Sequence, residues 1–225
     1  DRLEAFLGKA VADLGAAASA VLVSIGDELG LYSALARQPL SARELSQETG
    51  TSERYIREWL ANQAASGYVE FDPADDKYYL NDEQSACLAG ADGPADLPGA
   101  YQIIRDLFAV RDRAVENFRS GDGMEWGEHH PCLFDGTERF FRAGYHANLL
   151  SSWLPALDGV VEKLNRGGRA ADVGCGHGAS TLLMAQAFPN SQFVGIDYHG
   201  PSIDTARVRA AAAGVELKAA QVARV

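Results

Sequence analysis

The sequence predicts an α/β protein with a helical and winged-helix N-terminal domain, followed by the first βαβ part of a doubly wound domain. Two observations carry this prediction. A glycine-rich turn at 174–178 lies between an apolar strand pattern and a helix pattern. Upstream, two short helix patterns precede a predicted β-hairpin, which is the order of a winged helix. We place the domains at 1–90, 91–168 (a helical linker and lid) and 169–225.

The βαβ unit begins with a buried strand at 170–173 and ends with a second strand at 193–196. Three glycines at alternate positions of the turn let a ligand approach the backbone closely, because no Cβ stands in the way. The helix at about 179–188 points its N-terminal amides toward an anionic group. Asp197 follows Gly178 by 19 residues, near the roughly 20-residue spacing at which a carboxylate meets ribose hydroxyls. We therefore expect a nucleoside ligand with a compact anionic end.

The stretch from Asp172 to Gly178, with Asp197 at the end of the next strand, resembles the cofactor motif of class I S-adenosylmethionine-dependent methyltransferases. The resemblance implies a Rossmann-like domain in which Asp172 helps hold the amino end of S-adenosylmethionine. It implies that Asp197 takes both ribose hydroxyls, that Tyr198 packs beside the adenine and that Tyr145 reaches the methionine end. The residues assigned to cofactor binding are Asp172, Gly174, Cys175, Gly176, Gly178, Asp197, Tyr198 and Tyr145.

Two other function classes stay open at this point. Gly174, Gly176 and Ala179 also fit the G-x-G-x-x-A pattern of an NAD(P)-dependent enzyme. The carboxylate of Asp172, just before the loop, suits an ammonium group better than a pyrophosphate, and this favours the methyltransferase. The winged helix leaves room for a transcriptional regulator that binds the cofactor without performing chemistry.

Charge speaks against DNA binding by the winged helix. Residues 1–100 contain seven Lys and Arg residues against seventeen Asp and Glu residues. On the would-be recognition helix, Arg54 and Arg57 are matched by Glu53 and Glu58. A protein that reads DNA needs positive charge beside the phosphates. We therefore expect no specific DNA binding. The net charge of −11 likewise favours a small-molecule substrate over a nucleic acid.

The N-terminal segment has apolar residues at helical spacing from Leu3 to Ile25, with few charges between them. So wide an apolar face indicates burial on more than one side. It packs either against the winged helix alone or also against a second copy. We favour a homodimer, partly because the winged helix resembles the dimerisation and substrate-wall module of small-molecule O-methyltransferases.

Composition predicts a soluble, cytoplasmic protein. No apolar run approaches the roughly 18 residues that span a bilayer, and no basic-then-apolar leader opens the chain. Cys87, Cys132 and Cys175 include no C-x-x-C pair, so neither a disulfide framework nor a zinc site is indicated.

The segment before the βαβ unit is a predicted helix at 101–119 and then an aromatic, polar stretch at 126–146, which has the composition of a pocket wall. The alternative for this stretch is interdomain core with ordinary surface ion pairs. His129 and His130 cannot easily face one metal ion together, so we expect no metal. A histidine base is possible chemically. No catalytic residue is assigned.

Beyond Asp197 we expect a helix from Pro201 to about 213 and then a third strand at 215–219, although the alanine-rich end could equally be helical. The family resemblance implies a domain about twice as long as the part from Arg169 onward. We therefore expect this chain to be C-terminally incomplete, with most catalytic candidates in the absent half.

Overall fold

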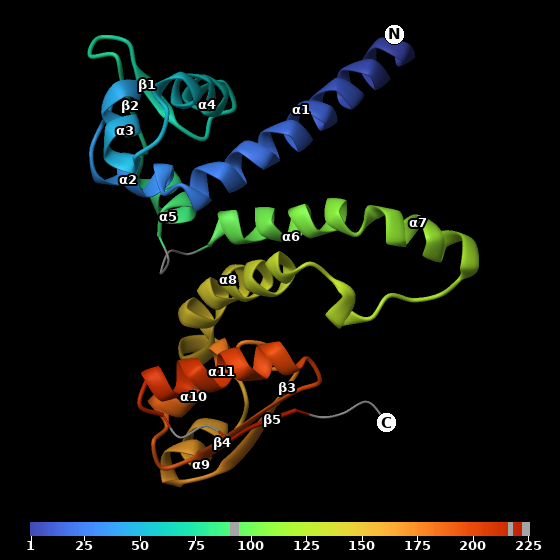
Figure 1. Cartoon of the computed structure of the whole chain (residues 1–225). Coiled ribbons are helices and arrows are strands. Elements are labelled where there is room, and N and C mark those ends of the chain that lie inside the picture. The colour runs from blue at the N-terminus through green and yellow to red at the C-terminus, as the bar shows by residue number, and fades with distance from the viewer. Residues whose placement is uncertain (91–94, 216–217, 222–225) are drawn as a thin grey trace. The chain divides into compact units, whose positions relative to one another are not determined.

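The computed structural model describes residues 1–90, 95–215 and 218–221 of the 225-residue chain. The chain forms two compact units, Asp1–Arg105 and Asp106–Val225 (Figure 1). The first unit contains the predicted winged helix and the second contains the predicted βαβ unit. Each unit has its own core.

Helix α1 (Arg2–Glu28) opens the first unit and begins with a capping box made by Asp1 and Glu4. Its final turns pack against the winged helix through buried Val23, and the Trp59 indole donates a 2.8 Å hydrogen bond to the carbonyl of Leu22. By length and composition α1 could cross a membrane: an 18-residue window has a mean hydropathy of 1.6. The expectation that no stretch approaches this length is therefore wrong. Core helices of soluble proteins pass the same test, although only 11% of this window is buried here.

The winged helix has the predicted order of helix, helix and β-hairpin. Its core gathers apolar side chains from every helix and from the hairpin, with Leu31, Leu45 and Leu60 fully buried. Its elements are α2 (Leu31–Arg37), α3 (Ala42–Thr49), α4 (Glu53–Ala65), β1 (Glu70–Asp72), β2 (Lys77–Tyr79) and α5 (Asp82–Leu88).

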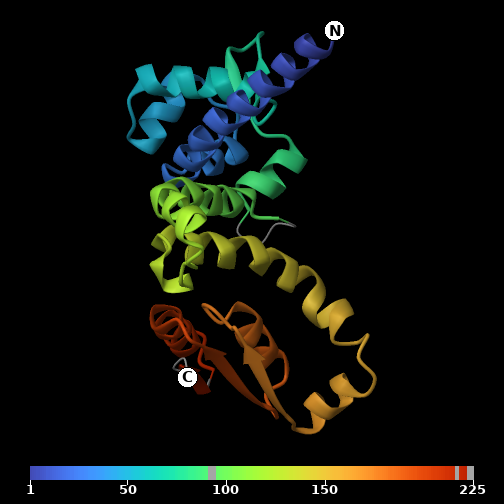
Figure 2. The same cartoon turned by 90° about the vertical axis from the view of Figure 1, so that its right-hand side faces the viewer.

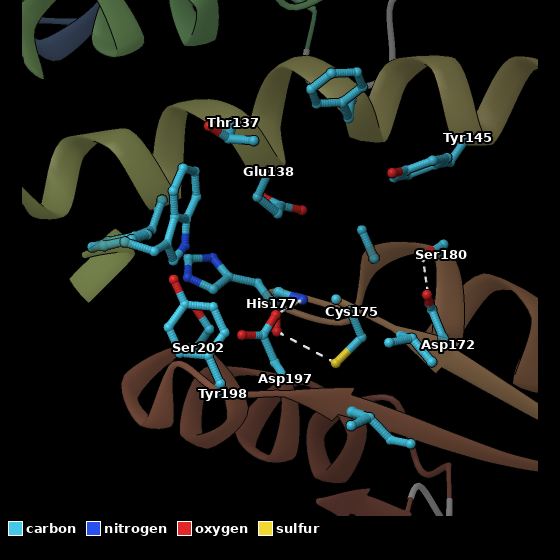
Figure 3. Close-up of a pocket in the computed structure, with 18 residues that line it drawn as sticks. Thr137, Glu138, Tyr145, Asp172, Cys175, His177, Ser180, Asp197, Tyr198 and Ser202 are labelled. Carbon is cyan, nitrogen blue, oxygen red and sulfur yellow. Dashed lines mark hydrogen bonds between the residues drawn. The ribbon is translucent and has the colours of Figure 1, made fainter. Parts of the chain in front are cut away.

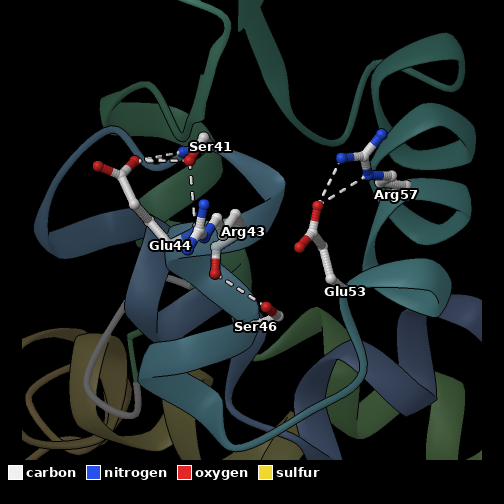
Figure 4. A network of polar contacts seen from close by, with 6 residues as sticks. All are labelled: Ser41, Arg43, Glu44, Ser46, Glu53 and Arg57. Carbon is white, nitrogen blue, oxygen red and sulfur yellow. Dashed lines mark hydrogen bonds and ion pairs between the residues drawn. The ribbon is translucent and has the colours of Figure 1, made fainter.

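The start of α3 shows how local chemistry sets these boundaries. The backbone amide of Glu44 donates to the hydroxyl of Ser41, and the amide of Ser41 donates to the carboxylate of Glu44, so the two residues form a capping box (Figure 4). Gly50 ends the helix with φ +66°, a conformation that favours glycine. Leu40 then bridges to Tyr78 of β2, which ties the helices to the hairpin.

The segment predicted as one helix at 101–119 is two helices, α6 (Leu97–Ala109) and α7 (Arg111–Ser120). The break is at Val110, whose φ of −94° and ψ of 4° depart from helical geometry. The first helix also begins earlier than expected, because the carboxylate of Asp96 accepts a hydrogen bond from the amide of Gly99 and so caps it. Apolar spacing continues across the break, so periodicity alone did not show it.

The second unit is built around a parallel sheet in the order β3-β4-β5. In Figure 2 the long helix α8 (yellow) can be seen passing beside this sheet. Its elements are η1 (Trp126–Glu128), α8 (Pro131–Asn148), η2 (Leu149–Trp153), α9 (Val160–Arg166), β3 (Arg169–Val173), α10 (Ala179–Ala187), β4 (Gln192–Asp197), α11 (Gly200–Ala212) and β5 (Lys218–Gln221).

The sheet confirms the predicted βαβ unit within a residue or two at each boundary. Val173 pairs with Ile196, so the carboxyl ends of β3 and β4 lie at the same edge. The third strand is described from Lys218 to Gln221, and it pairs with β4 from Val194 onward. The helical alternative, which covered residues 219–225, is therefore wrong for residues 219–221, while the expectations for 216–217 and 222–225 lie outside the described residues. Residues 154–156, which follow η2, form a turn.

Candidate functional site

A cavity of about 660 Å³ lies at the carboxyl ends of β3 and β4 (Figure 3). This is the edge at which doubly wound sheets bind ligands, and the volume suits a small molecule. Its walls come from the glycine loop, the end of β4, the first turn of α10, and α8 with its preceding turn. The lining residues are Trp126, Phe134, Thr137, Glu138, Phe141, Tyr145, Asp172, Val173, Gly174, Cys175, Gly176, His177, Ala179, Ser180, Ile196, Asp197, Tyr198 and Ser202.

The glycine loop has the conformation that its sequence predicts. Gly174, Gly176 and Gly178 have φ values of +79°, +52° and +78°, in the region that favours glycine. A Cβ at Gly174 or Gly176 would meet nothing within 4 Å, whereas one at Gly178 would lie 3.1 Å from the Cβ of Ala206. Gly178 is the one predicted site residue that does not line the cavity. Its position is instead close to Ala206 of α11.

Asp197 holds the loop and the end of β4 together. Its Oδ2 accepts a 2.8 Å hydrogen bond from the amide of Gly176, and its Oδ1 accepts a 2.9 Å bond from the amide of His199. The carboxylate is buried. Each carboxylate oxygen has a second lone pair, so Asp197 can still accept hydroxyl donors from a molecule in the cavity.

Asp172 lies at the other side of the cavity, where Figure 3 shows it next to Ser180, with Tyr145 of α8 above both. Its Oδ2 accepts hydrogen bonds from the hydroxyls of Ser180, at 2.7 Å, and Thr181, at 2.6 Å. Sequence reasoning missed both hydroxyls. Their place in the sequence could have indicated a role at the site, because they occupy the first turn of the helix that follows the glycine loop.

Tyr145 of α8 lines the cavity as predicted. Burial, and next the charge of Asp172, raise the pKa of the Tyr145 phenol. The hydroxyl therefore keeps its proton at neutral pH and can donate a hydrogen bond. Its ring lies near Phe141 and edge-on to Trp153, with centroids 6.5 and 6.1 Å away, and these rings fix its direction.

Cys175 and His177 complete the loop. Burial, and then the charges of Asp172 and Asp197, raise the pKa of the Cys175 thiol to about 11, so the sulfur is a poor nucleophile. Burial, and next the charge of Arg209, lower the pKa of His177, so its imidazole is neutral near pH 7. His177 is a cavity-lining residue to which sequence reasoning gave no role.

The aromatic and polar stretch at 126–146 supplies the wall facing the loop, as its composition predicts. Phe134 stacks on His199 with ring centroids 4.1 Å apart. Glu138 is not in an ordinary surface pair, because its carboxylate is buried and lies 2.7 Å from the guanidinium of Arg209. The interpretation of this stretch as surface ion pairs is therefore wrong for Glu138.

His129 and His130 have separate partners. The Nδ1 of His129 lies 2.7 Å from Oδ2 of Asp106, a fully buried carboxylate whose Oδ1 accepts from the amide of His130. The His130 ring instead accepts from the amide of Cys132 and so caps α8. Within the ranges that the structure describes, no group of three or more His, Cys, Asp or Glu side chains is arranged to hold a metal ion.

Comparison with known proteins connects both units to known domains. Residues 17–90 match the Rv2258c-like winged HTH domain, and residues 170–224 match the methyltransferase domain family. A search of the curated proteins finds no match.

Solved structures of similar fold include one described as a putative O-methyltransferase from Nostoc punctiforme (TM-score 0.67, 16% identity, covering 97% of this chain and 64% of that one). They also include mitomycin 7-O-methyltransferase (TM-score 0.66, 19% identity, covering 100% of this chain and 67% of that one). A third is human N-acetylserotonin methyltransferase in complex with S-adenosylmethionine (TM-score 0.62, 15% identity, covering 99% of this chain and 67% of that one).

These matches confirm the predicted combination of a winged helix with a Rossmann-like methyltransferase domain. They give no support to the NAD(P)-dependent or regulatory alternatives. The chain spans about two thirds of the length of the solved structures that it resembles.

Proposed function

We propose that this chain belongs to an enzyme that binds S-adenosylmethionine and transfers its methyl group to a small molecule. The observation that carries the proposal is the placement of two carboxylates, Asp172 and Asp197, on either side of an open glycine loop at the ends of adjacent parallel strands. Similarity to O-methyltransferase folds favours an oxygen acceptor.

The residues present suit this cofactor. Asp172 and Tyr145 face one end of the cavity with a charge and a hydroxyl that suit an amino-acid group, and Asp197 offers lone pairs to ribose hydroxyls. Gly174 and Gly176 leave room for the part of the cofactor that joins its amino-acid group to its ribose, because the space that a Cβ would take at either position is open. Tyr198 supplies an aromatic surface for adenine.

When bound, S-adenosylmethionine supplies an electrophilic methyl group on a sulfonium. The chain's own contribution is to hold that donor in one orientation and to exclude water with the aromatic wall of α8. The His129–Asp106 pair shows how this chain orients an imidazole by a buried carboxylate. The described cavity wall does not include His129. We therefore name no residue of this chain as the base that removes the acceptor's proton.

Calorimetry with S-adenosylhomocysteine, run beside NAD, tests the proposal. The parent should bind the first and not the second. Asp197→Asn should weaken that binding about 10- to 100-fold, because hydrogen bonds to a charged acceptor are lost. Asp204→Asn, an exposed carboxylate on α11, is the matched control and should bind like the parent. Binding of NAD alone, or equal affinity in Asp197→Asn, would refute the proposal.

We also propose that α1 mediates homodimer formation. Its apolar side chains Leu3, Phe6, Val11 and Leu14 are all more than 60% exposed within one chain. An apolar groove of about 470 Å³ lies between the end of α1 and α4. Exposed apolar surface of this extent is typical of an interaction site. Light scattering of Phe6→Glu should give a monomer where the parent gives a dimer. A monomeric parent would contradict this, and binding of the parent to lipid vesicles would indicate a membrane role instead.

We infer that the winged helix does not read DNA and that the protein is cytoplasmic. The first inference is supported by two ion pairs within α4, Arg54 with Glu58 and Arg57 with Glu53, which occupy the arginines (Figure 4 shows the second pair). The second inference is supported by the cysteines, since none of the three, all of which the structure describes, is joined in a disulfide. A gel shift with genomic fragments at physiological salt should show no specific complex.

A further inference from the structure

Two hydroxyls of α10 converge on a single oxygen of Asp172. Ser180 and Thr181, consecutive residues in the helix's first turn, both donate to Oδ2, at 2.7 and 2.6 Å. An ionised carboxylate oxygen has two lone pairs, so these two donors occupy Oδ2. In the part of the chain that the structure describes, no hydrogen bond reaches Oδ1 of Asp172, and Asp172 lines the cavity.

We propose that Thr181 is a positioning residue for recognition of an ammonium group. With Ser180 it locks one oxygen of Asp172 and leaves Oδ1 to bind the ammonium of the amino-acid end of S-adenosylmethionine. This inference rests on the proposed function, and it names which atom of the site recognises which group of the cofactor.

A substitution at Thr181 tests the positioning role without removing a direct contact to the ligand. Its side chain is fully buried and is not part of the cavity wall, so it acts on a bound molecule only through Asp172. Ser180 lines the cavity and can touch a ligand directly. Substitution of Thr181 by valine keeps the branched shape and removes only the hydroxyl.

The competing interpretation is that the hydroxyls only fasten α10 to β3. A fastening role makes the whole loop less ordered when it is lost, and every ligand of the cavity then binds more weakly. A positioning role affects ligands that carry the ammonium group and spares those that do not. The two interpretations therefore differ in the pattern of affinities across a pair of ligands.

The test is calorimetry with S-adenosylhomocysteine and with its analogue in which hydrogen replaces the amino group. We expect Thr181→Val to bind S-adenosylhomocysteine about tenfold more weakly than the parent and to bind the analogue with parental affinity. Thr181→Ser, which keeps the hydroxyl, should restore parental affinity for both. Thr205→Val on α11, where the hydroxyl donates to the carbonyl of Pro201 in the same helix, is the matched control.

Equal losses for both ligands in Thr181→Val would overturn the inference, as would a parent that binds the two ligands equally well. A parent that binds neither would overturn the proposed function, and the inference with it. Where Thr181→Val does not fold, Thr181→Ala, which also removes the hydroxyl, is examined with the same two ligands, with the same pattern expected and the same result overturning the inference.

Discussion

Glu138 of α8 and Arg209 of α11 form an ion pair in which the Glu138 side chain is only 6% exposed, with Oε1 and Nη1 2.7 Å apart. Oε1 has no well-aligned hydrogen bond, while Nη2 donates to Oε2 at 3.3 Å, so the contact is mainly ionic. The pair joins the helix that lines one wall of the cavity to the helix that follows β4. Both ends of the pair lie in the second unit.

Loss of Arg209 should therefore destabilise the second unit. Arg209→Gln leaves the carboxylate of Glu138 buried, with Arg142 at 3.8 Å as partial compensation. We expect a loss of about 2–4 kcal/mol in the free energy of unfolding, measured with urea. Arg207→Gln, on the same helix, breaks an exposed pair with Asp204 and should cost under about 1 kcal/mol. Equal effects of the two changes would contradict this account.

Two glycines of the loop should respond differently to alanine. Both Gly174 and Gly178 have positive φ, so each change adds backbone strain of about 1–2 kcal/mol. Only Gly178→Ala adds a contact of 3.1 Å, with Ala206, and it should lower the melting temperature more. Gly174→Ala should instead reduce affinity for S-adenosylhomocysteine about tenfold, because its Cβ takes space beside the ligand. Thermal melts with calorimetry measure both effects, and a reversed order would refute the assignment.

In the first unit, Gly26 permits α1 to pack on α4. A Cβ at Gly26 would collide with Cζ2 of Trp59, while one at Gly15 of the same helix meets nothing within 4 Å. Gly26→Ala should destabilise the unit by about 1–3 kcal/mol through overpacking. Gly15→Ala should stabilise it by about 0.5–1 kcal/mol through helix propensity. Urea unfolding of both variants provides the comparison, and a stable Gly26→Ala protein would show that this packing is wrong.

The thiol of Cys175 should be unreactive at neutral pH. Burial raises its pKa to about 11, and only the thiolate reacts with iodoacetamide. We expect its labelling in the native protein to be slow at pH 7 and to increase about tenfold for each pH unit up to pH 9, because the thiolate fraction grows in that proportion below the pKa. Mass spectrometry of peptides measures the rate, with urea-unfolded protein as the control. Rapid labelling of native Cys175 at pH 7 would contradict the assigned burial.

The elements were predictable from sequence because their causes are local. The apolar periodicity of α4, the capping box of Ser41 and Glu44, and the alternate glycines of the loop each act within a few residues. The glycine spacing and Asp197 also located the candidate site, since β3 and β4 end together when two parallel strands pair in register. The break between α6 and α7 at Val110 was not predicted, because apolar spacing continues through it.

By itself, then, the sequence determined the order of the elements, the winged helix, and the acidic and glycine residues at the strand ends. Only the tertiary structure decided which distant side chains meet: Ser180 and Thr181 on one oxygen of Asp172, Glu138 on Arg209, and Asp106 on His129. The physical reason is the distance along the chain over which each interaction acts. Hydrogen bonding and propensity act along a few residues of chain, whereas these contacts depend on strand register and helix packing, which no short stretch of sequence specifies.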